Sequence, residues 1–366
     1  MFKEVKGRFG FGCMRLPMKG NEVDIEQVNV MVDKFIEAGF NYFDTAHGYI
    51  DGLSEKAVKT CVSDRYDRSK FILANKLTGP YFKCEEDIIP LFESQLEICG
   101  VDYFDFYLMH CQTKEVYKKF KECNAYNVAY KLKELGKVKH VGFSFHDNAE
   151  VLDMILSEQP KIEFVQLQFN YLDYNDYNVQ AKKCLEVCIK HGKPVIVMEP
   201  VRGGVLANLP DEGKEVLKEV WDHSAASFAL RFVGSFEQVF MILSGMGTIS
   251  QMEDNISHMK DIIPFSDAEY KTADRIASII RSKKLIECTN CRYCVAGCPK
   301  KILIPDMFKS MNSKNPEDYL RYTIGHGKAS ECIKCGKCEK ACPQQIQIRK
   351  NLEEANCQMT EALQNK

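Results

Sequence analysis

The sequence predicts an α/β protein in two parts, a (β/α)8 barrel of the TIM type followed by a small, mostly helical, cysteine-rich segment. Two observations support this prediction. The first 275 residues alternate short apolar runs with amphipathic stretches, which is typical of repeated βα units. Near the C-terminus, a pattern of four cysteines and a proline occurs twice. Because 366 residues allow one large domain and one small one, we expect domains at 1–275 and 276–366.

Eight apolar runs are the expected strands of the barrel. They are residues 8–12, 40–44, 71–76, 104–110, 139–144, 163–169, 194–199 and 239–244. Eight strands, each followed by a helix, within roughly 260 residues fit a closed barrel. A doubly wound open sheet is the alternative, but no GxGxxG motif follows the first strand to support it.

Amphipathic stretches between these runs are the expected helices. They are residues 24–38, 54–63, 87–99, 116–135, 148–156, 179–190 and 224–232, with 252–259 after the last strand. Residues 263–267 are the expected exit from the barrel. A short helix at 268–280 then leads into the cysteine-rich segment.

The cysteine pattern is Cys-x2-Cys-x2-Cys-x3-Cys-Pro, and its second copy lies 44 positions after the first. The two runs are Cys288, Cys291, Cys294 and Cys298, and Cys332, Cys335, Cys338 and Cys342. This is the ligand pattern of a domain with two iron–sulfur clusters. Three cysteines at this spacing can direct their sulfurs at three corners of a cubane, but they are too crowded to supply the fourth. A pair of zinc sites and a disulfide framework are the alternatives.

Both runs resemble those of bacterial ferredoxins, in which the fourth cysteine of each run serves the other cluster. That resemblance implies two 4Fe-4S clusters. One would be held by Cys288, Cys291, Cys294 and Cys342, and the other by Cys332, Cys335, Cys338 and Cys298. Because 306–311 and 317–322 are expected to be helical, the segment looks like a helical dicluster ferredoxin domain.

Composition limits the compartment and the partners. The first seven residues contain no apolar core of a signal peptide, and no apolar run approaches the roughly 18 residues of a membrane span. We therefore expect a cytoplasmic protein without membrane contact. The other nine cysteines do not have the regular spacing of a disulfide framework, as expected in a compartment where thiols stay reduced. A net charge of −2 predicts no nucleic-acid binding.

Polar residues end three consecutive expected strands, where the chemistry of such a barrel takes place. Asp44, followed by Tyr49, ends the second strand, Lys76 ends the third and His110 ends the fourth. The sequence around them resembles the aldo-keto reductase family over residues 1 to about 275. The resemblance is carried by Asp-Thr-Ala-x-x-Tyr at 44–49, Ser-Glu at 54–55, Ile-Leu-Ala-Asn-Lys at 72–76, Asp-Phe-Tyr-Leu-Met-His at 105–110, Gly-Phe-Gly at 10–12 and Val-Gly-Phe-Ser at 141–144.

These four residues also make chemical sense as a catalytic set. Reduction of a carbonyl needs an acid whose pKa lies well below the value of about 10 for a free tyrosine. Lys76 beside Tyr49 would lower that pKa, and Asp44 would hold Lys76 charged and in place. His110 would orient the substrate oxygen and share its developing charge. The alternative for Asp44 and Lys76 is a structural ion pair at the barrel mouth.

The resemblance implies a nicotinamide cofactor, NADP(H) or NAD(H), but the pocket departs from the family pattern. Ser144 and Gln166 match, and Gly12, at the end of the first expected strand, is a further expected cofactor contact. Phe145 stands where the family has asparagine, and Met198 stands where it has a stacking aromatic residue.

Two further segments match the nucleotide-binding loops of the family. Arg202 and Gly203 would contact the pyrophosphate, and Gln251 and Asn255 would contact adenine. Gly245 and Gln251 occupy the positions where many relatives have basic residues for a 2′-phosphate, so the sequence leaves NAD and NADP open.

We therefore expect an oxidoreductase that interconverts a carbonyl and an alcohol of a small-molecule substrate, with electron transfer through two 4Fe-4S clusters. A hydride carries two electrons and each cluster accepts one. A flavin could convert between them, although no motif supports it, and the clusters could instead be structural or receive electrons from a partner protein. The alternative function is an electron-transfer subunit whose barrel binds nicotinamide or flavin as a sensor or docking module.

Overall fold

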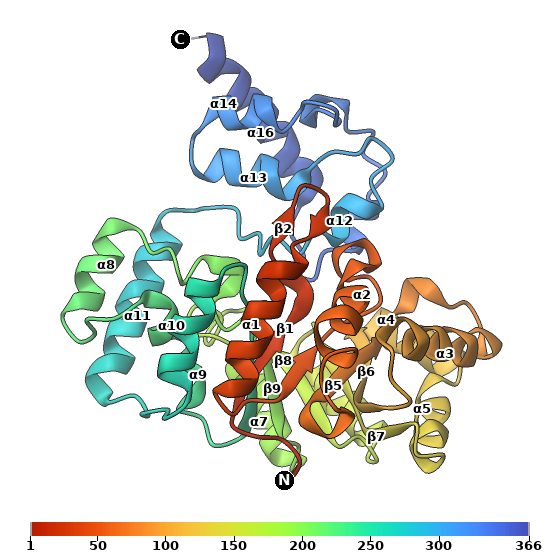
Figure 1. Ribbon diagram of the computed structural model, residues 1–366. Helices are drawn as coiled ribbons and strands as arrows, with labels where there is room; N and C mark the ends of the chain where they lie inside the picture. Colours follow the sequence, from red (N-terminus) through yellow and green to blue (C-terminus); the bar gives the residue numbers. More distant parts are fainter. Residues whose placement is uncertain (1, 365–366) are drawn as a thin grey trace. The chain divides into compact units, whose positions relative to one another are not determined.

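The computed structural model describes residues 2–364 and divides them into two compact units (Figure 1). The first unit comprises the residues up to 201 together with 214–274. The second comprises 202–213 together with the residues from 275 onward. No pattern in the sequence indicated that the short segment 202–213 would pack with the C-terminal part of the chain.

The first unit is a closed barrel of eight parallel strands, which confirms the predicted fold class. Around the barrel the strand order is β1-β10-β9-β8-β7-β6-β5-β4. The strands are β1 Phe9–Gly12, β4 Tyr42–Asp44, β5 Ile72–Leu77, β6 Phe104–Gln112, β7 Val138–Phe145, β8 Phe164–Gln168, β9 Val195–Met198 and β10 Val239–Gly245. Their continuous apolar runs reflect burial on both faces, which is typical of parallel strands.

Helices cover the outside of the barrel, as Figure 1 shows. They are α1 Ile25–Glu37, α2 Leu53–Val58, α3 Ile88–Cys99, α4 Lys114–Glu122, α5 Ala125–Glu134, α6 Ala149–Glu158, α7 Ala181–Lys190, α9 Ala225–Gly234 and α10 Ile249–Met259. Side-chain caps fix several of their starts. Asp24 accepts a hydrogen bond from the backbone of Gln27 at 3.1 Å, and Asn148 accepts one from Val151 at 3.1 Å.

Four features differ from the sequence expectation. The expected helix 116–135 is two helices, because Asn124 adopts a φ of 52° between them. The helix after Tyr49 ends in a π-helical turn, Lys59–Ser63. A two-stranded hairpin, β2 Met18–Lys19 and β3 Glu22–Val23, and a helix, α8 Asp211–Lys218, were not expected. The two hairpin strands are two residues long, too short to produce an alternating apolar pattern.

Aromatic side chains fill the interior of the barrel. Tyr42, Phe106, Phe164 and Phe240 belong to one buried cluster there. Phe2 packs edge-on against Phe106 with the ring centroids 5.0 Å apart, so the N-terminal segment covers this cluster. The barrel is therefore a packed core and not a pore.

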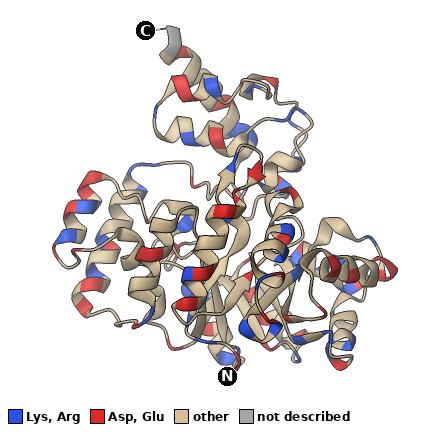
Figure 2. Ribbon diagram, in the orientation of Figure 1, with Lys and Arg blue, Asp and Glu red and all other residues tan. Residues whose placement is uncertain are grey.

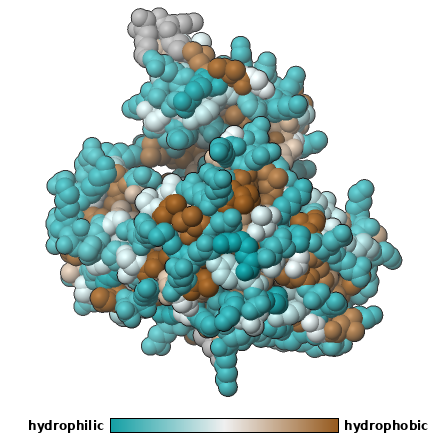
Figure 3. Space-filling view, in the orientation of Figure 1, coloured by the Kyte–Doolittle hydropathy of each residue, from teal (hydrophilic) through white to brown (hydrophobic). Residues whose placement is uncertain are grey.

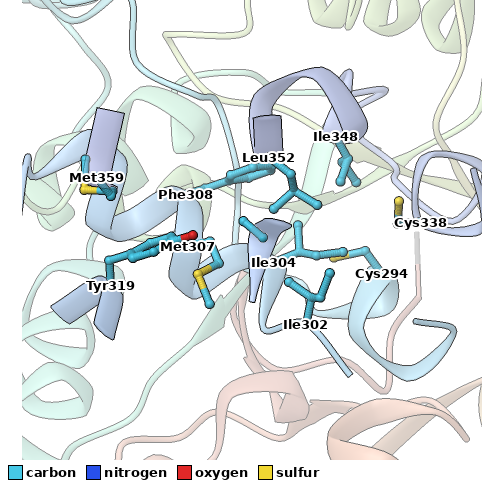
Figure 4. Close-up of a cluster of buried hydrophobic side chains, with 11 residues drawn as sticks. Cys294, Ile302, Ile304, Met307, Phe308, Tyr319, Cys338, Ile348, Leu352 and Met359 are labelled. Carbon is cyan, nitrogen blue, oxygen red and sulfur yellow. The ribbon is translucent and has the colours of Figure 1, made fainter. Parts of the chain in front are cut away.

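The second unit is built from short helices around a small core. The helices are α12 Tyr293–Ala296, α13 Ile304–Asn312, α14 Pro316–Arg321, α15 Lys337–Lys340 and α16 Ile348–Gln364, and α11 Asp267–Ser282 precedes them. The expected helices at 306–311 and 317–322 correspond to α13 and α14. Figure 4 shows Cys294 and Cys338 at the end of the core near Ile304 and Ile348, away from Met359.

Charged residues of both signs alternate along the ribbon in Figure 2, without a long stretch of one sign. The face seen in Figure 3 is mostly hydrophilic, with hydrophobic side chains in separate patches. Scattered exposure of this kind is ordinary for folded proteins. Among the described residues, no helix has the length and apolar character required to cross a bilayer.

Candidate functional site

Three neighbouring strands bring the predicted catalytic residues to one end of the barrel. Asp44 ends β4 and pairs with Ala74 of β5, and Lys76 of β5 pairs with Leu108 of β6. His110 follows two residues later on β6. Because these strands are parallel and adjacent, their carboxyl ends meet at the same edge.

Lys76 is the centre of this group. Its side chain is fully buried, and its Nζ donates hydrogen bonds to Asp44 Oδ1 and to the Thr45 carbonyl oxygen, each at 2.7 Å. The same Nζ lies 4.7 Å from the centroid of the Tyr49 ring. Burial raises the pKa of Asp44 above its ordinary value, and the Lys76 ammonium offsets part of the rise. The ion pair therefore lies in a low-dielectric environment, where it acts strongly on the adjacent ring.

Tyr49 is held by a strained turn. It is 7% exposed, and its backbone N–H donates to the Ala46 carbonyl at 3.0 Å. The next residues, Ile50 and Asp51, both have a φ of 52°. A left-handed conformation is unusual for a β-branched residue, and each such residue costs about 1–3 kcal/mol. Strain of this size is commonly stored where a side chain must be held in place.

His110 completes the group. Its ring lies 6.0 Å from that of Tyr49, measured between centroids, and Nδ1 shares a hydrogen bond of 2.8 Å with Thr78 Oγ1. Burial, together with the positive charge of Lys76, holds the pKa of His110 well below its ordinary value. The imidazole is therefore neutral near pH 7 and acts as a hydrogen-bonding group. The structure thus brings all four predicted residues together.

The predicted nicotinamide contacts lie on adjacent strands. Ser144 of β7 pairs with Gln166 of β8. Ser144 Oγ accepts a hydrogen bond from the backbone N–H of Cys111 at 2.8 Å. Gln166 is 2% exposed, and its Oε1 has no hydrogen-bond partner among the described residues. A buried acceptor without a partner is costly, so this oxygen fits a ligand that donates an N–H.

Gly12 approaches the backbone of β10 closely, because a Cβ at this position would lie 3.3 Å from the Ser244 carbonyl oxygen. Asn255 is buried, and its Nδ2 donates to Ser244 Oγ at 3.1 Å. Gln251 Oε1 accepts a hydrogen bond from the Gly247 backbone at 2.8 Å. These two amides stabilise the loop after β10, and their contact with adenine stays a prediction.

Arg202 and Gly203 belong to the second unit. The Arg202 side chain is 3% exposed, and its Nη2 forms an ion pair with Glu287 Oε2 at 2.7 Å. A Cβ on Gly203 would lie 2.5 Å from the Thr289 carbonyl oxygen, so only glycine fits there. Arg202 is thus already engaged by a carboxylate that a phosphate would have to replace or share.

Sequence analysis missed an ion pair near the end of β9. Glu199 Oε1 contacts Arg15 Nη2 at 2.9 Å, and the carboxylate oxygen Oε2 is buried without a hydrogen-bond partner among the described residues. Asn170 Nδ2 donates to the Glu199 carbonyl at 3.0 Å. Glu199 also has a φ of 55°, the one local sign that this position is constrained.

A buried polar network behind Lys76 was also missed. Glu55 Oε2 contacts His47 Nδ1 at 2.8 Å, and its Oε1 accepts from Asn75 Nδ2 at 2.8 Å. Asn75 Oδ1 accepts from the Lys76 backbone N–H at 2.8 Å, and Gln95 Nε2 donates to the Lys76 carbonyl at 3.0 Å. Both sides of the Lys76 peptide are therefore fixed by buried amides.

The eight predicted cluster cysteines line two cavities in the second unit. One cavity is lined by Cys288, Cys291, Cys294 and Cys342. The other is lined by Cys298, Cys332, Cys335 and Cys338. In each cavity the fourth cysteine comes from the other run. We call these the 288 cavity and the 332 cavity.

The sulfurs in each cavity are close enough to influence one another. Burial raises the pKa of the Cys294 thiol, and the neighbouring Cys291 and Cys288 thiols add to the rise. Burial raises the pKa of the Cys338 thiol to about 11. Within residues 2–364, no three or more Cys, His, Asp or Glu side chains are arranged to hold one metal ion. A 4Fe-4S cubane does not require several side chains to converge on one ion, because each of its four cysteines binds a different iron.

Comparison with known proteins gives two family matches. Residues 8–278 match the Aldo/keto reductase family, and residues 287–347 match the 4Fe-4S dicluster domain. The chain is therefore an oxidoreductase of the aldo/keto reductase type that also contains a 4Fe-4S dicluster domain.

Individual relatives are distant. An uncharacterized oxidoreductase, YqkF, from Bacillus subtilis is 24% identical over 286 residues, which cover 68% of this chain and 85% of the relative. An NADH-specific methylglyoxal reductase from Escherichia coli is 23% identical over 288 residues, which cover 66% of this chain and 85% of the relative.

Solved structures share the fold. The holo form of aldo-keto reductase AKR11C1 from Bacillus halodurans has a TM-score of 0.60 at 23% identity and covers 74% of this chain and 91% of that protein. An aldo/keto reductase from Klebsiella pneumoniae in complex with NADP and acetate has a TM-score of 0.60 at 19% identity, with the same coverage. Because the family match spans most of the chain and the barrel agrees with it, the chain belongs to the aldo/keto reductase family.

Proposed function

We propose that this protein interconverts a carbonyl and an alcohol with a nicotinamide cofactor and passes electrons through two 4Fe-4S clusters. The observation that carries the proposal is the buried Lys76–Asp44 pair, with its ammonium 4.7 Å from the centre of the Tyr49 ring and His110 beside it. The reductase domain is assigned to residues 1–275 and the cluster domain to 276–366.

The four residues divide the work of carbonyl reduction. The Lys76 charge favours the phenolate of Tyr49, so Tyr49 gives up its proton to the substrate oxygen more readily than a free tyrosine. The neutral His110 ring donates a hydrogen bond to the same oxygen as negative charge develops there. Asp44 keeps Lys76 charged and oriented through the bond of 2.7 Å.

Gln166 and Ser144 are the residues proposed to hold the nicotinamide. The buried Gln166 Oε1, which has no partner among the described residues, supports a contact with the carboxamide N–H. Bound nicotinamide would supply the hydride. The names of distant relatives include both an NADH-specific enzyme and an NADP complex. The neutral Gly245 and Gln251 support NAD(H) for this chain, because neither would compensate a 2′-phosphate charge.

The two cysteine-lined cavities support the cluster assignment. The 288 cavity would hold one 4Fe-4S cluster and the 332 cavity the other, and each cluster would supply one electron at a time. Ile304 lines both cavities, so the two clusters would be close neighbours within the second unit. Two neighbouring clusters suit exchange of electrons with a redox partner protein.

The test uses anaerobically purified full-length protein and its Tyr49→Phe variant. The wild type should contain about eight irons per chain. Tyr49→Phe should lower kcat for reduction of a small aldehyde by at least roughly 10²-fold while the Kd for NADH or NADPH is kept. Tyr81→Phe is the matched control, since Tyr81 is a tyrosine of the same end of the barrel that is 47% exposed.

Near-normal turnover in Tyr49→Phe would show that the acid lies elsewhere. Wild-type protein that binds the cofactor and fills its clusters, yet reduces no carbonyl, would favour the alternative of an electron-transfer subunit. Absence of iron would overturn the cluster assignment.

A further inference from the structure

The surroundings of the two cysteine-lined cavities differ in charge, although the sequences that form them are repeats. We propose that the cluster in the 332 cavity has the higher reduction potential and is reduced first. This inference rests on the proposed assignment of one 4Fe-4S cluster to each cavity. It adds a direction to the electron transfer between them.

Crossed ligation produces the difference. Lys300 follows Cys298 by two positions, and Gln344 follows Cys342 by two positions, so the two residues are equivalent in the repeat. Because the fourth cysteine of each run lines the cavity of the other, Lys300 lines the 332 cavity and Gln344 lines the 288 cavity. One cavity therefore receives an ammonium where the other receives a neutral amide.

The remaining charges act in the same direction. The 332 cavity is lined by Lys300, Lys337 and Arg349, whereas Arg292 is the one basic residue among those that line the 288 cavity. Each arginine is balanced by a carboxylate. Arg349 Nη2 contacts Glu339 at 2.7 Å, and Arg292 Nη2 contacts Asp306 at 2.7 Å.

The two lysines are not balanced in this way. Neither Lys300 nor Lys337 forms an ion pair with any residue in the described part of the chain. The 332 cavity therefore has two more positive charges than the 288 cavity once the arginine pairs are set aside. Lys334, also near Cys332, is paired with Glu353 and adds little to this difference.

Positive charge raises a reduction potential, because the reduced cluster carries one more negative charge than the oxidised one. Solvent exposure is a second influence on the potential, and Cys335 in the 332 cavity is exposed while all four cysteines of the 288 cavity are at least partly buried. One backbone hydrogen bond acts in the opposite direction, because Asn290 N–H lies 3.4 Å from Cys288 Sγ in the 288 cavity. It is a single long contact with a partial charge, whereas the 332 cavity is lined by two full ammonium charges.

The electron transfer itself is simple. One electron passes from the reduced cluster in the 288 cavity to the oxidised cluster in the 332 cavity. The first is oxidised and the second is reduced, and no bond or proton of the protein changes. The equilibrium then favours the electron on the 332 side.

The experiment is an EPR-monitored redox titration of the anaerobic full-length protein with reciprocal variants. Lys300→Gln should lower the potential of the cluster that is reduced first, and Gln344→Lys should raise the potential of the other. A change of one exposed charge should alter the ratio of reduced to oxidised cluster by about threefold at a fixed potential. This threefold change corresponds to a shift of about 28 mV in the reduction potential of a one-electron couple. Lys309→Gln is the control, because exposed Lys309 on α13 lines neither cavity.

The inference is overturned if Lys300→Gln changes the potential of the cluster that is reduced second. It is also overturned if Lys300→Gln and Gln344→Lys change the potentials no more than Lys309→Gln does. If Lys300→Gln fails to assemble clusters, the direction and target of the Gln344→Lys shift decide the question alone. A wild-type protein with no cluster signal would instead refute the proposed function, so the two failures are distinguishable.

Discussion

At the residue scale, the buried ion pair between Lys76 and Asp44 makes a strong prediction about stability. Lys76→Met would leave the Asp44 carboxylate buried without its charged partner, which should destabilise the barrel by about 3–5 kcal/mol. Adding Asp44→Asn to Lys76→Met removes the stranded charge and should recover much of the loss. Thermal unfolding followed by circular dichroism, compared across the single and double variants, measures this coupling.

The same pair predicts a dependence on pH. Burial raises the folded-state pKa of Asp44, so the native state binds this proton more tightly than the unfolded chain does. Stability from this group is therefore present at low pH and is lost as pH rises. In Lys76→Met, which lacks the offsetting ammonium, the thermal midpoint should fall more steeply than in the wild type as the pH rises above the ordinary aspartate pKa of about 3.9. An equal fall in both proteins would show that Asp44 is not the titrating group.

Some site residues could be predicted from the sequence and others could not. Asp44, Lys76 and His110 end consecutive strands, so the pattern of the barrel alone places them together. The ion pair between Arg15 and Glu199 joins residues 184 positions apart, and no local pattern signals such a contact. Only the folded chain shows which long-range partners meet.

At the scale of elements, the strained turn after Tyr49 predicts a pair of opposite effects. Ile50→Asn replaces a β-branched residue at a φ of 52° with one that tolerates this conformation. The free energy of unfolding should therefore increase by about 1 kcal/mol, and the thermal midpoint should rise with it. Gly52→Ala places a side chain at a φ of 85° and should lower stability by a similar amount. The carbonyl-reduction kcat of Ile50→Asn checks whether Tyr49 stays in place.

A fall in the midpoint of Ile50→Asn would show that the packing of the Ile50 side chain outweighs the backbone strain. A rise in the midpoint combined with a large loss of kcat would show that the strain itself positions Tyr49. Either result separates the two contributions, because Gly52→Ala changes the backbone without removing a packed side chain.

The strands were predictable within a few residues because buried parallel strands are continuous apolar runs bounded by polar residues. The prediction of a single helix at 116–135 was wrong, because a tertiary contact accompanies a break at Asn124. Asn124 Nδ2 donates to Glu85 Oε1 at 3.0 Å, and its left-handed backbone ends one helix and begins the next. Local periodicity continues across this break, so the sequence pattern does not reveal it.

At the scale of the whole molecule, the repeat of 44 residues sets the arrangement of the second unit. Ile302 and Ile346 are equivalent in the repeat and pack against the same core, as do Ile304 and Ile348. The resemblance of the runs to those of bacterial ferredoxins implied that the fourth cysteine of each run would serve the other cluster, and the two cavities have that composition. The pairing of segment 202–213 with this unit had no such periodic signal, because it depends on contacts such as Arg202 with Glu287.

Crossed ligation makes a prediction that separates it from two independent runs. Cys298→Ala should remove the cluster of the 332 cavity and leave that of the 288 cavity, although Cys298 belongs to the first run. Rapid alkylation of the anaerobic protein followed by peptide mass spectrometry measures which thiols become reactive. Cys332, Cys335 and Cys338 should be labelled, whereas Cys288, Cys291 and Cys294 should stay protected by their cluster. Cys357→Ala, at an exposed cysteine outside both cavities, is the control and should leave both sets protected. Labelling of Cys288, Cys291 and Cys294 in Cys298→Ala would mean that each run binds its own cluster.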